Sequence, residues 1–321
     1  MGAVGVKNGV AENGAAMAEI DLSVSIRGSK MVNPVGVASG TFGYGSEYEK
    51  LIDLRAIGAL YTKAVTLEPR AGNDVPRIVE TASGMLNSIG LANVGVSRFL
   101  SEKLPFLSGL ECAVIANVAG SSAEEYLAVV ERLESEGKPL WGYEINLSCP
   151  NVKEGCMIFG TSHREVERLT GRLRAVTDKP LIVKLTPNVT DITDVARAAE
   201  AGGADAVSCI NTLLGMVIDT KKKRTVLPGG TGGLSGPAIL PVGVAAVYRV
   251  ARAVAIPVIG LGGIACADDA VQYLLAGAKA VQIGTANFSD PATAGRVLSG
   301  ITDYARREGL RTIADFNSLL A

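Results

Sequence analysis

Eight short apolar runs recur along the chain, and each ends at or near Gly, Pro, Asn or another turn-forming residue. They begin at Val35, Ala59, Cys112, Tyr143, Leu181, Ala206, Pro257 and Ala280. Short runs of this kind, rich in Val and Ile, are typical of strands that are buried on both faces. Between most of them lie longer segments, such as 121–137 and 191–203, whose apolar residues recur about every 3.6 positions and predict amphipathic helices.

The alternation of eight strands with helices predicts a parallel sheet, because parallel strands need long crossover connections. Eight such units favour a closed (β/α)8 TIM barrel over an open doubly wound sheet, and 321 residues fit one such domain. We therefore expect an α/β fold with a single barrel over residues 21–321 and a flexible N-terminal tail over residues 1–20. Segments 65–111 and 216–235 are long for simple connections, and they predict loop or hairpin insertions over the C-terminal mouth of the barrel.

The composition of the chain indicates which kind of molecule it binds. The chain is 48% hydrophobic, and its 31 Lys and Arg against 32 Asp and Glu leave a formal charge of -1. No global positive field attracts nucleic acid or an anionic membrane, so we expect a small-molecule partner. The uncharged stretch 225–248 is rich in Gly and Pro and predicts a loop followed by a helix start, not a membrane span. The first twenty residues lack the apolar core of a signal peptide, which predicts a cytoplasmic enzyme.

The chemistry of a (β/α)8 barrel lies at the carboxyl ends of its strands. The residues at which the apolar runs become polar there include no Asp, Glu or His, and Lys63 and Lys184 stand out among them. An unpaired ammonium inside an apolar run is costly to bury, so each lysine needs an anionic partner. No acid lies near either lysine on its own strand, which favours a bound phosphate, carboxylate or reduced flavin. A lysine that extends to solvent is the alternative.

Two glycine-containing turns, GLGGIA at 260–265 and IGTANF at 283–288, follow the last two predicted strands. Backbone N–H groups in such turns can bind a phosphate, and TIM barrels place phosphate sites after strands seven and eight. GLGGIA alone also fits a dinucleotide-binding pattern, but the next strand offers no acid to hold a ribose. The alternative is that the glycines only permit tight turns.

The cysteines predict thiol chemistry without a metal. Five of them, at 112, 149, 156, 209 and 266, contain no C-x-x-C pair, which argues against a disulfide framework, a zinc site or an iron–sulfur cluster on this chain. Cys112, Cys209 and Cys266 lie in or beside apolar runs and are predicted to be core residues. Cys156 stays ambiguous.

Cys149 is the candidate proton acceptor. It precedes Pro150, which disfavours a helical conformation and places the thiol in a loop directly after a strand. A thiol there can remove a moderately acidic carbon-bound proton, with an inert thiol as the alternative. The single histidine, His163, is predicted to lie on the surface, so a nucleophilic Cys–His pair is not supported.

Seven motifs stand in one order along the chain: PRIVETASGMLNSIGLANVG, EINLSCPNVK, VKLTPNVTDI, INTLLGM, TGGLSGPAI, IGLGGI and IGTANF. From about Met31 to the C-terminus, the chain resembles the dihydroorotate dehydrogenases, and in particular class 1B, the form with a separate electron-transfer subunit. The resemblance implies an FMN-containing barrel that oxidises (S)-dihydroorotate to orotate in pyrimidine biosynthesis. Two departures from the family pattern are Cys156, where glycine is common, and Gly229–Gly230 before TGG.

The resemblance also implies roles for single residues. Cys149 matches the catalytic base that takes the C5 proton while a hydride passes from C6 to the flavin, and Lys184 would stabilise the reduced ring. The implied FMN-binding residues are Ser39, Lys63, Ala64, Asn117, Asn146, Lys184, Ile210, Gly236, Gly262, Gly263, Gly284 and Thr285. The implied substrate-binding residues are Lys63, Asn87, Ser88, Ile89, Gly90, Leu91, Asn146, Asn151, Asn211 and Thr212.

The electrons of reduced FMN need an acceptor. The chain has no C-x-x-C pair and no complete nicotinamide fingerprint, so the resemblance implies a partner subunit that carries FAD and a [2Fe-2S] cluster and passes electrons to NAD. It further implies a homodimer at the core of a heterotetramer. The alternatives are a stand-alone enzyme that uses fumarate, a related FMN barrel acting on another dihydropyrimidine, a flavin-free phosphate-sugar lyase or isomerase, and a non-catalytic barrel.

Overall fold

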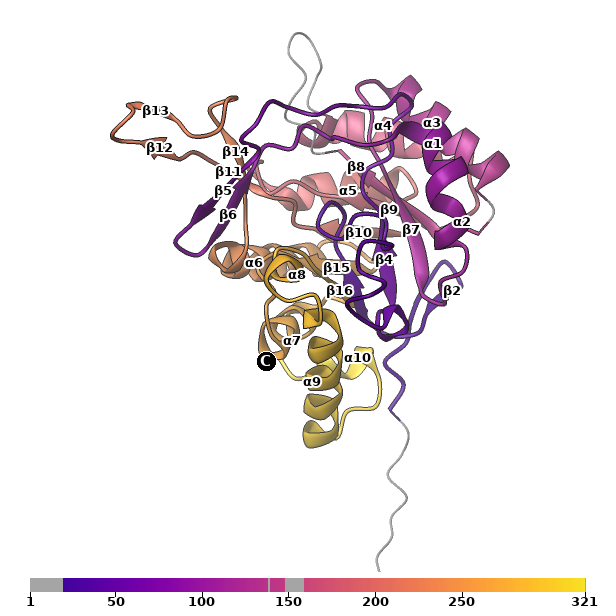
Figure 1. Ribbon diagram of the computed structural model, residues 1–321. Helices are drawn as coiled ribbons and strands as arrows, with labels where there is room; N and C mark the ends of the chain where they lie inside the picture. The colour runs from indigo at the N-terminus through magenta and orange to yellow at the C-terminus, as the bar shows by residue number, and fades with distance from the viewer. Residues whose placement is uncertain (1–19, 138, 148–158, 321) are drawn as a thin grey trace, which may run out of the picture.

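The computed structural model describes residues 20–137, 139–147 and 159–320. Its centre is a closed barrel of eight parallel strands, drawn in Figure 1. In chain order the barrel strands are β3 (Val35–Val37), β4 (Ala59–Tyr61), β7 (Ala113–Val118), β8 (Gly142–Asn146), β9 (Leu181–Lys184), β10 (Ala206–Cys209), β15 (Val258–Leu261) and β16 (Ala280–Ile283). Pairing of β16 with β3 closes the barrel. The predicted (β/α)8 barrel is confirmed, and each predicted run supplies one of its strands.

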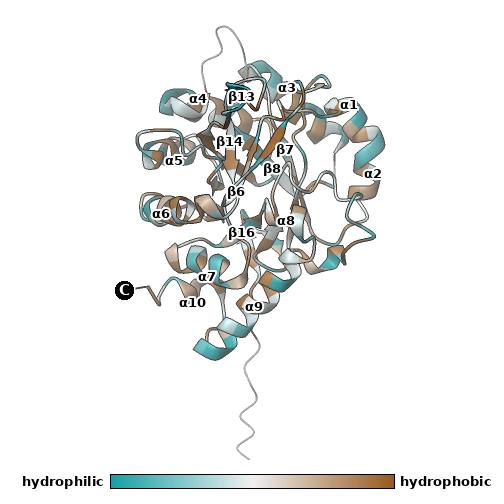
Figure 2. Ribbon diagram, turned by 60° about the vertical axis from the view of Figure 1, so that its left-hand side comes forward, coloured by the Kyte–Doolittle hydropathy of each residue, from teal (hydrophilic) through white to brown (hydrophobic). Residues whose placement is uncertain are grey.

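The barrel strands are buried on both faces. Every residue of β7, β9, β10, β15 and β16 is buried. One face of each strand fills the interior and the other packs under the surrounding helices, several of which, such as α3, α4 and α9, carry hydrophilic segments in Figure 2. This double burial explains why the strands read as continuous apolar runs and do not alternate.

The helices cover the outside of the barrel. The longer ones are α3 (Ala123–Glu136), α4 (His163–Arg174), α5 (Ile192–Ala201), α6 (Leu240–Ala251), α7 (Ala267–Ala276) and α9 (Thr293–Glu308). Short helical segments are α1 (Gly95–Arg98), α2 (Leu104–Leu107), α8 (Ala286–Ser289), α10 (Ile313–Phe316), the 3-10 turns η1 (Leu54–Ala56), η3 (Phe159–Thr161) and η4 (Pro237–Ile239), and the π-helical η2 (Phe99–Lys103).

Helix α3 shows how the sequence defines one of these elements. Its N-cap Ser122 accepts a hydrogen bond from the backbone N–H of Glu125, and acidic residues in the first turn complement the helix dipole. Tyr126, Val129, Val130 and Leu133 recur at helical spacing and are buried. The Tyr126 hydroxyl donates to the backbone oxygen of Asn146 over 2.7 Å, so this helix also anchors the carboxyl end of β8.

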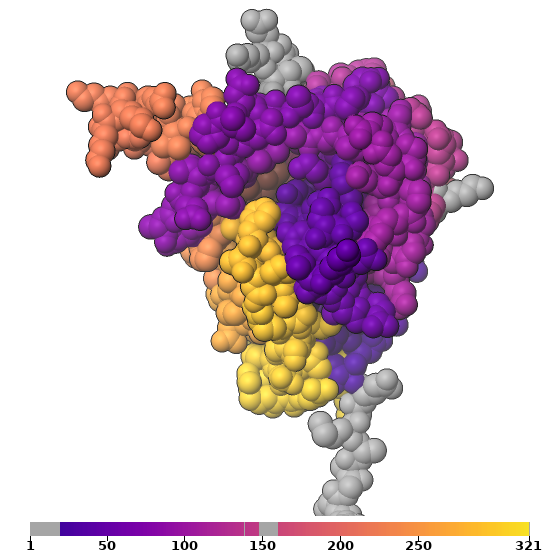
Figure 3. Space-filling view, in the orientation of Figure 1, coloured from indigo at the N-terminus to yellow at the C-terminus, as the bar shows by residue number. Residues whose placement is uncertain are grey.

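The two long connections form additional structure at the carboxyl end of the barrel, as predicted. Strands β5 (Ile78–Thr81), β6 (Gly84–Asn87), β11 (Leu213–Gly215) and β14 (Gly232–Ser235) make an antiparallel sheet in the order β11-β14-β6-β5. A second hairpin, β12 (Ile218–Asp219) and β13 (Arg224–Thr225), projects from the surface in Figure 3. Strand β11 directly follows the end of β10, so the sheet is attached where the chemistry is expected.

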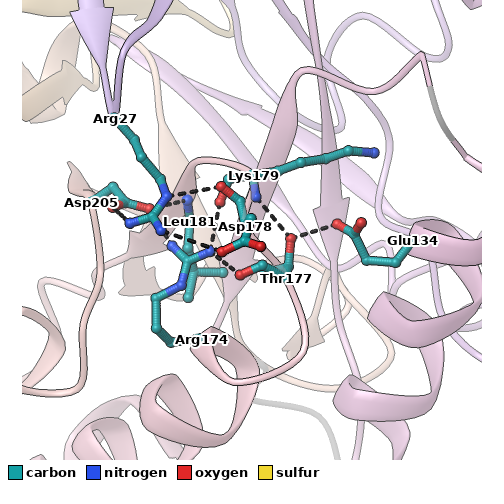
Figure 4. A network of polar contacts seen from close by, with 8 residues as sticks. All are labelled: Arg27, Glu134, Arg174, Thr177, Asp178, Lys179, Leu181 and Asp205. Atoms are coloured by element: carbon teal, nitrogen blue, oxygen red, sulfur yellow. Dashed lines mark hydrogen bonds and ion pairs between the residues drawn. The ribbon is translucent and has the colours of Figure 1, made fainter.

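A polar network ties the amino end of the barrel together (Figure 4). The hairpin of β1 (Val24–Ile26) and β2 (Ser29–Met31) carries Arg27 at its turn. Asp205 accepts hydrogen bonds from Arg27 over 3.1 Å and from the backbone N–H of Leu181 over 2.9 Å, and it pairs with Arg174. The network connects this hairpin to the start of β9 and to helix α4 at the end of the barrel opposite the site.

The predictions for His163 and for three of the cysteines were confirmed except at Cys266. His163 is exposed as the first residue of α4, as predicted, and Cys112 and Cys209 are buried. The prediction that Cys266 is a core residue is wrong, because it occupies the exposed N-cap of α7, where its N–H donates to Asp269 over 3.1 Å. Residues 1–19 lie outside the described part, so the N-terminal tail stays a prediction. Within the described ranges, no helix is both long enough and apolar enough to cross a membrane.

Candidate active site

The carboxyl ends of the barrel strands bring most of the predicted site residues to one rim. The rim residues and nearby loop residues on this side of the barrel are Ser39, Lys63, Ala64, Asn117, Asn146, Lys184, Ile210, Asn211, Thr212, Gly262, Gly263, Gly284 and Thr285. Gly236, the last of the predicted FMN residues, follows β14 of the added sheet. Residues from all eight strands therefore converge at the mouth of the barrel.

Lys63 lies just after β4 and is partly buried. Burial is the main cause that lowers the pKa of its ammonium, the negative charge of Glu47 opposes this shift, and the positive charge of Arg77 adds to it. Among the residues that the structure describes, Lys63 forms no ion pair. A bound anion would therefore stabilise the charged form of this lysine, as the sequence suggests.

Lys184 differs from this expectation. Its side chain is almost fully buried, and its Nζ lies 3.6 Å from the Oε2 of Glu144, which is itself fully buried in β8. The expectation of a bound anion as its necessary partner is thus corrected, because the neighbouring strand supplies a carboxylate. The signal that could have identified Glu144 is the acid itself, since a carboxylate inside an apolar strand is rare unless it is paired.

Several amide side chains lie at the same rim of the barrel. Asn117 is fully buried and its Nδ2 donates to Glu144 over 2.6 Å. Its Oδ1 is buried and has no hydrogen-bond partner within the described residues. Asn211 donates to the Oδ1 of Asn146 over 3.2 Å, and the backbone N–H of Thr212 donates to Asn211 over 2.8 Å. The orphaned oxygen of Asn117 can accept a hydrogen bond from a ligand.

The two glycine turns lie side by side, because they follow β15 and β16, which are paired neighbours in the barrel. Gly263 has φ +75, and a Cβ there would come within 2.7 Å of the backbone nitrogen of Leu240. A Cβ on Gly284 would meet nothing closer than Ala38 at 3.8 Å, and Thr285 donates to Ser235 over 2.8 Å. The backbone conformation and the close approach of Leu240 therefore require glycine at position 263. At position 284, no protein atom would clash with a side-chain methyl group.

The inserted segment 87–91 reaches the same region. Asn87 donates to the backbone oxygen of Gly233 over 3.2 Å, and a Cβ on Gly233 would clash with the Thr212 side chain. Ser88 accepts a hydrogen bond from Asn73 over 2.8 Å, while Gly90 and Leu91 both have positive φ. These contacts place the insertion beside the end of β10, as its predicted role in substrate binding requires.

Three residues of the sequence-based account fall outside the described part of the chain. They are Cys149, the predicted base, Asn151, a predicted substrate contact, and Cys156. Their roles remain predictions from the sequence.

Comparison with known proteins assigns the chain to a family. The sequence model described as dihydroorotate dehydrogenase matches residues 21–304. The chain belongs to the dihydroorotate dehydrogenase family. It is 52% identical over 299 residues to the "Dihydroorotate dehydrogenase B (NAD(+)), catalytic subunit" of Geotalea daltonii, covering 93% of this chain and 98% of that protein. The protein of the same name from Geobacter sulfurreducens is 50% identical over 299 residues, with the same coverage of both chains.

A solved dihydroorotate dehydrogenase structure agrees with the fold. It is the enzyme of Eimeria tenella in complex with ferulenol, with a TM-score of 0.76 and 23% sequence identity, covering 92% of this chain and 87% of that one. At this identity the likeness supports the TIM barrel alone. The resemblance inferred from the seven motifs is confirmed by the family match and by the two bacterial relatives.

Proposed function

We propose that this member of the dihydroorotate dehydrogenase family oxidises (S)-dihydroorotate to orotate in pyrimidine biosynthesis, using one FMN per chain. The observation that carries the proposal is the convergence, at one barrel mouth, of three features: a partly buried lysine and an amide oxygen that have no ion-pair or hydrogen-bond partner among the described residues, and an open glycine turn. A cyclic imide acid and a flavin phosphate supply the charges and hydrogen-bond donors that these groups lack.

The residues at the mouth fit FMN. The Asn117 oxygen can accept from a flavin or ribityl donor, and the ammonium of Lys184 can face the flavin edge that becomes negative on reduction. Backbone N–H groups near Gly263, Gly284 and Thr285 can bind the phosphate. The remaining proposed FMN contacts are Ser39, Lys63, Ala64, Asn146, Ile210, Gly236 and Gly262.

The substrate would bind between the lysine of β4 and the inserted segment. Lys63 would pair with its carboxylate, because an ammonium in a partly desolvated position favours an anion. The amides Asn146, Asn151 and Asn211, with Thr212 and residues 87–91, would contact the edges of the ring. An uncharged pyrimidine would leave Lys63 without a partner, which favours dihydroorotate over other dihydropyrimidines.

The reaction removes one proton and one hydride from the substrate, leaving a C5–C6 double bond. Cys149 would take the proton from C5 as a general base. Bound FMN supplies the acceptor for the hydride that leaves C6. Lys184 would hold a positive charge beside the ring, and the amides would keep the two reacting carbons aligned with base and acceptor.

An electron-transfer partner belongs to the same proposal. The names of the bacterial relatives include NAD and the words "catalytic subunit". A catalytic subunit belongs to an enzyme with a further subunit, which supports such a partner for this chain too. We infer that it carries FAD and a [2Fe-2S] cluster, docks near FMN, and joins a homodimer of this chain in a heterotetramer. The cytoplasmic location stays a prediction.

Steady-state assays of the purified chain alone test this proposal. We expect a yellow protein that oxidises dihydroorotate with an artificial dye as acceptor but turns over with neither NAD nor fumarate. Efficient turnover with NAD or with fumarate would contradict the partner and leave the dehydrogenase assignment intact. A colourless chain that acts on sugar phosphates would contradict the whole proposal.

A further inference from the structure

The interior of the barrel holds a buried carboxylate at the centre of a polar cluster. Glu144 is fully buried in the middle of β8. Its Oε1 accepts hydrogen bonds from Ser208 over 2.8 Å and from Gln282 over 2.8 Å. Its Oε2 accepts from Asn117 over 2.6 Å and lies 3.6 Å from the ammonium of Lys184. Side chains from β7, β9, β10 and β16 thus converge on one acid.

This carboxylate determines the orientation of the side-chain amides of Asn117 and Gln282. An ionised carboxylate only accepts hydrogen bonds, so Asn117 and Gln282 must both turn their NH2 groups toward Glu144. Their oxygens then face away, and each is buried with no hydrogen-bond partner within the described residues. The acid therefore fixes the orientation of the Asn117 amide near the carboxyl end of β7.

The carboxylate also lies beside the side chain of Lys184. The two groups form an ion pair in the barrel interior, where charges interact more strongly than in water because the local dielectric constant is low. The effect of the acid reaches Tyr61, whose pKa is raised well above its usual value, first by burial and then by the negative charge of Glu144. The Tyr61 hydroxyl therefore stays neutral, and the carboxylate balances the ammonium.

We propose that Glu144 is a positioning residue for the flavin site, which fixes the amide of Asn117 and keeps Lys184 charge-balanced, so that it lowers the midpoint potential of bound FMN. This inference rests on the proposed function. Hydride uptake adds one negative charge to the flavin. A lysine paired with an internal carboxylate stabilises that added charge less than an uncompensated lysine does.

The potential distinguishes this role from a merely structural one. A structural defect weakens the binding of oxidised and reduced FMN alike and leaves the potential unchanged. A change of charge at Lys184 alters the ratio of the two affinities, and a tenfold change of that ratio corresponds to about 30 mV for a two-electron couple.

The experiment measures the midpoint potential of the FMN-loaded chain by equilibration with reference dyes. We expect Glu144→Gln to favour reduced over oxidised FMN by about tenfold or more. Glu144→Asp, which keeps the charge, and Ser208→Ala, which removes one hydrogen bond without changing a charge, should both stay within about threefold of the unsubstituted chain. An unchanged potential in Glu144→Gln with FMN bound would overturn the inference.

A second comparison covers the case in which Glu144→Gln does not fold or does not retain FMN. Lys184→Met should lower the potential, and Lys184→Met with Glu144→Gln, which leaves no unpaired buried charge, should raise it again. Equal potentials in these two variants would also overturn the inference. An unsubstituted chain that binds no FMN would instead contradict the proposed function, so the two failures are distinguishable.

Discussion

Asn211 donates a hydrogen bond to Asn146 over 3.2 Å, although 65 positions separate them along the chain. Asn146 ends β8 and Asn211 follows β10, so the bond passes across the end of β9, which carries Lys184. Two amides with proposed roles in substrate binding are thus held against each other by the protein itself. Such prior order lowers the entropic cost of binding a ligand.

The clearest test of substrate identity is the charge of Lys63. Lys63→Ala should weaken orotate binding by about 2–3 kcal/mol, roughly 30- to 150-fold, because a hydrogen bond to a charged group is lost. Uracil, which has no carboxylate, should be affected far less. Titrations that follow the flavin spectrum measure both ligands. Lys63→Arg, which keeps the charge, serves as the control, and equal losses for orotate and uracil would favour another dihydropyrimidine as substrate.

The same lysine predicts a pH dependence. Burial lowers its pKa below the usual 10.5, and only the charged form pairs with a carboxylate. Orotate affinity should therefore be constant at neutral pH and fall as the pH rises through this lowered pKa. In Lys63→Arg the fall should move to higher pH, because a guanidinium stays protonated there. Orotate affinity measured across the alkaline range checks this, and the same decline in both proteins would exclude Lys63 as its source.

Much of the fold could be predicted from the sequence, because a parallel strand that is buried on both faces is a continuous run of apolar residues. The eight runs became the eight barrel strands, and 65–111 and 216–235 became insertions. The pairing of Lys184 could not be read in this way. Glu144 stands on the neighbouring strand, 40 positions earlier, and the pairing and register of β8 with β9 bring the two side chains together.

The position of Cys266 and the contact between Asn211 and Asn146 were also not predictable from the sequence alone. An apolar neighbourhood in sequence does not distinguish the core from a helix N-cap, which faces solvent at the end of a buried strand. The amides were both predicted as site residues, but contact between strands that are not neighbours depends on barrel curvature, which a single sequence does not reveal.

The glycine turns predict a contrast between two alanine variants. Gly284→Ala should fold as well as the unsubstituted chain without FMN, since its Cβ meets only Ala38 at 3.8 Å, yet it should bind FMN at least tenfold more weakly if the phosphate occupies that space. Gly263→Ala should lose both stability and FMN binding, because its Cβ would contact Leu240. Thermal unfolding of the apoprotein and FMN fluorescence titration separate the two effects. Undiminished FMN binding in Gly284→Ala would contradict the proposed position of the phosphate at this turn.

Replacement of the predicted base should affect chemistry alone. Cys149→Ser should keep the yellow colour and orotate binding while dihydroorotate oxidation at neutral pH falls by about 10²- to 10⁴-fold, because a hydroxyl of much higher pKa replaces the thiol. Cys266→Ser, an exposed thiol at the start of α7, is the matched control and should oxidise dihydroorotate normally. A dye-coupled assay measures the rates, and an unaltered rate in Cys149→Ser would end its assignment as the base.

We expect this chain alone to transfer a hydride from dihydroorotate to its own FMN. Anaerobic mixing of the purified chain with dihydroorotate tests it without any partner or acceptor, by following flavin absorbance and orotate together. We expect the flavin colour to bleach in a single turnover and one orotate to appear for each FMN reduced. A chain whose bound FMN stays oxidised in the presence of saturating dihydroorotate would contradict it.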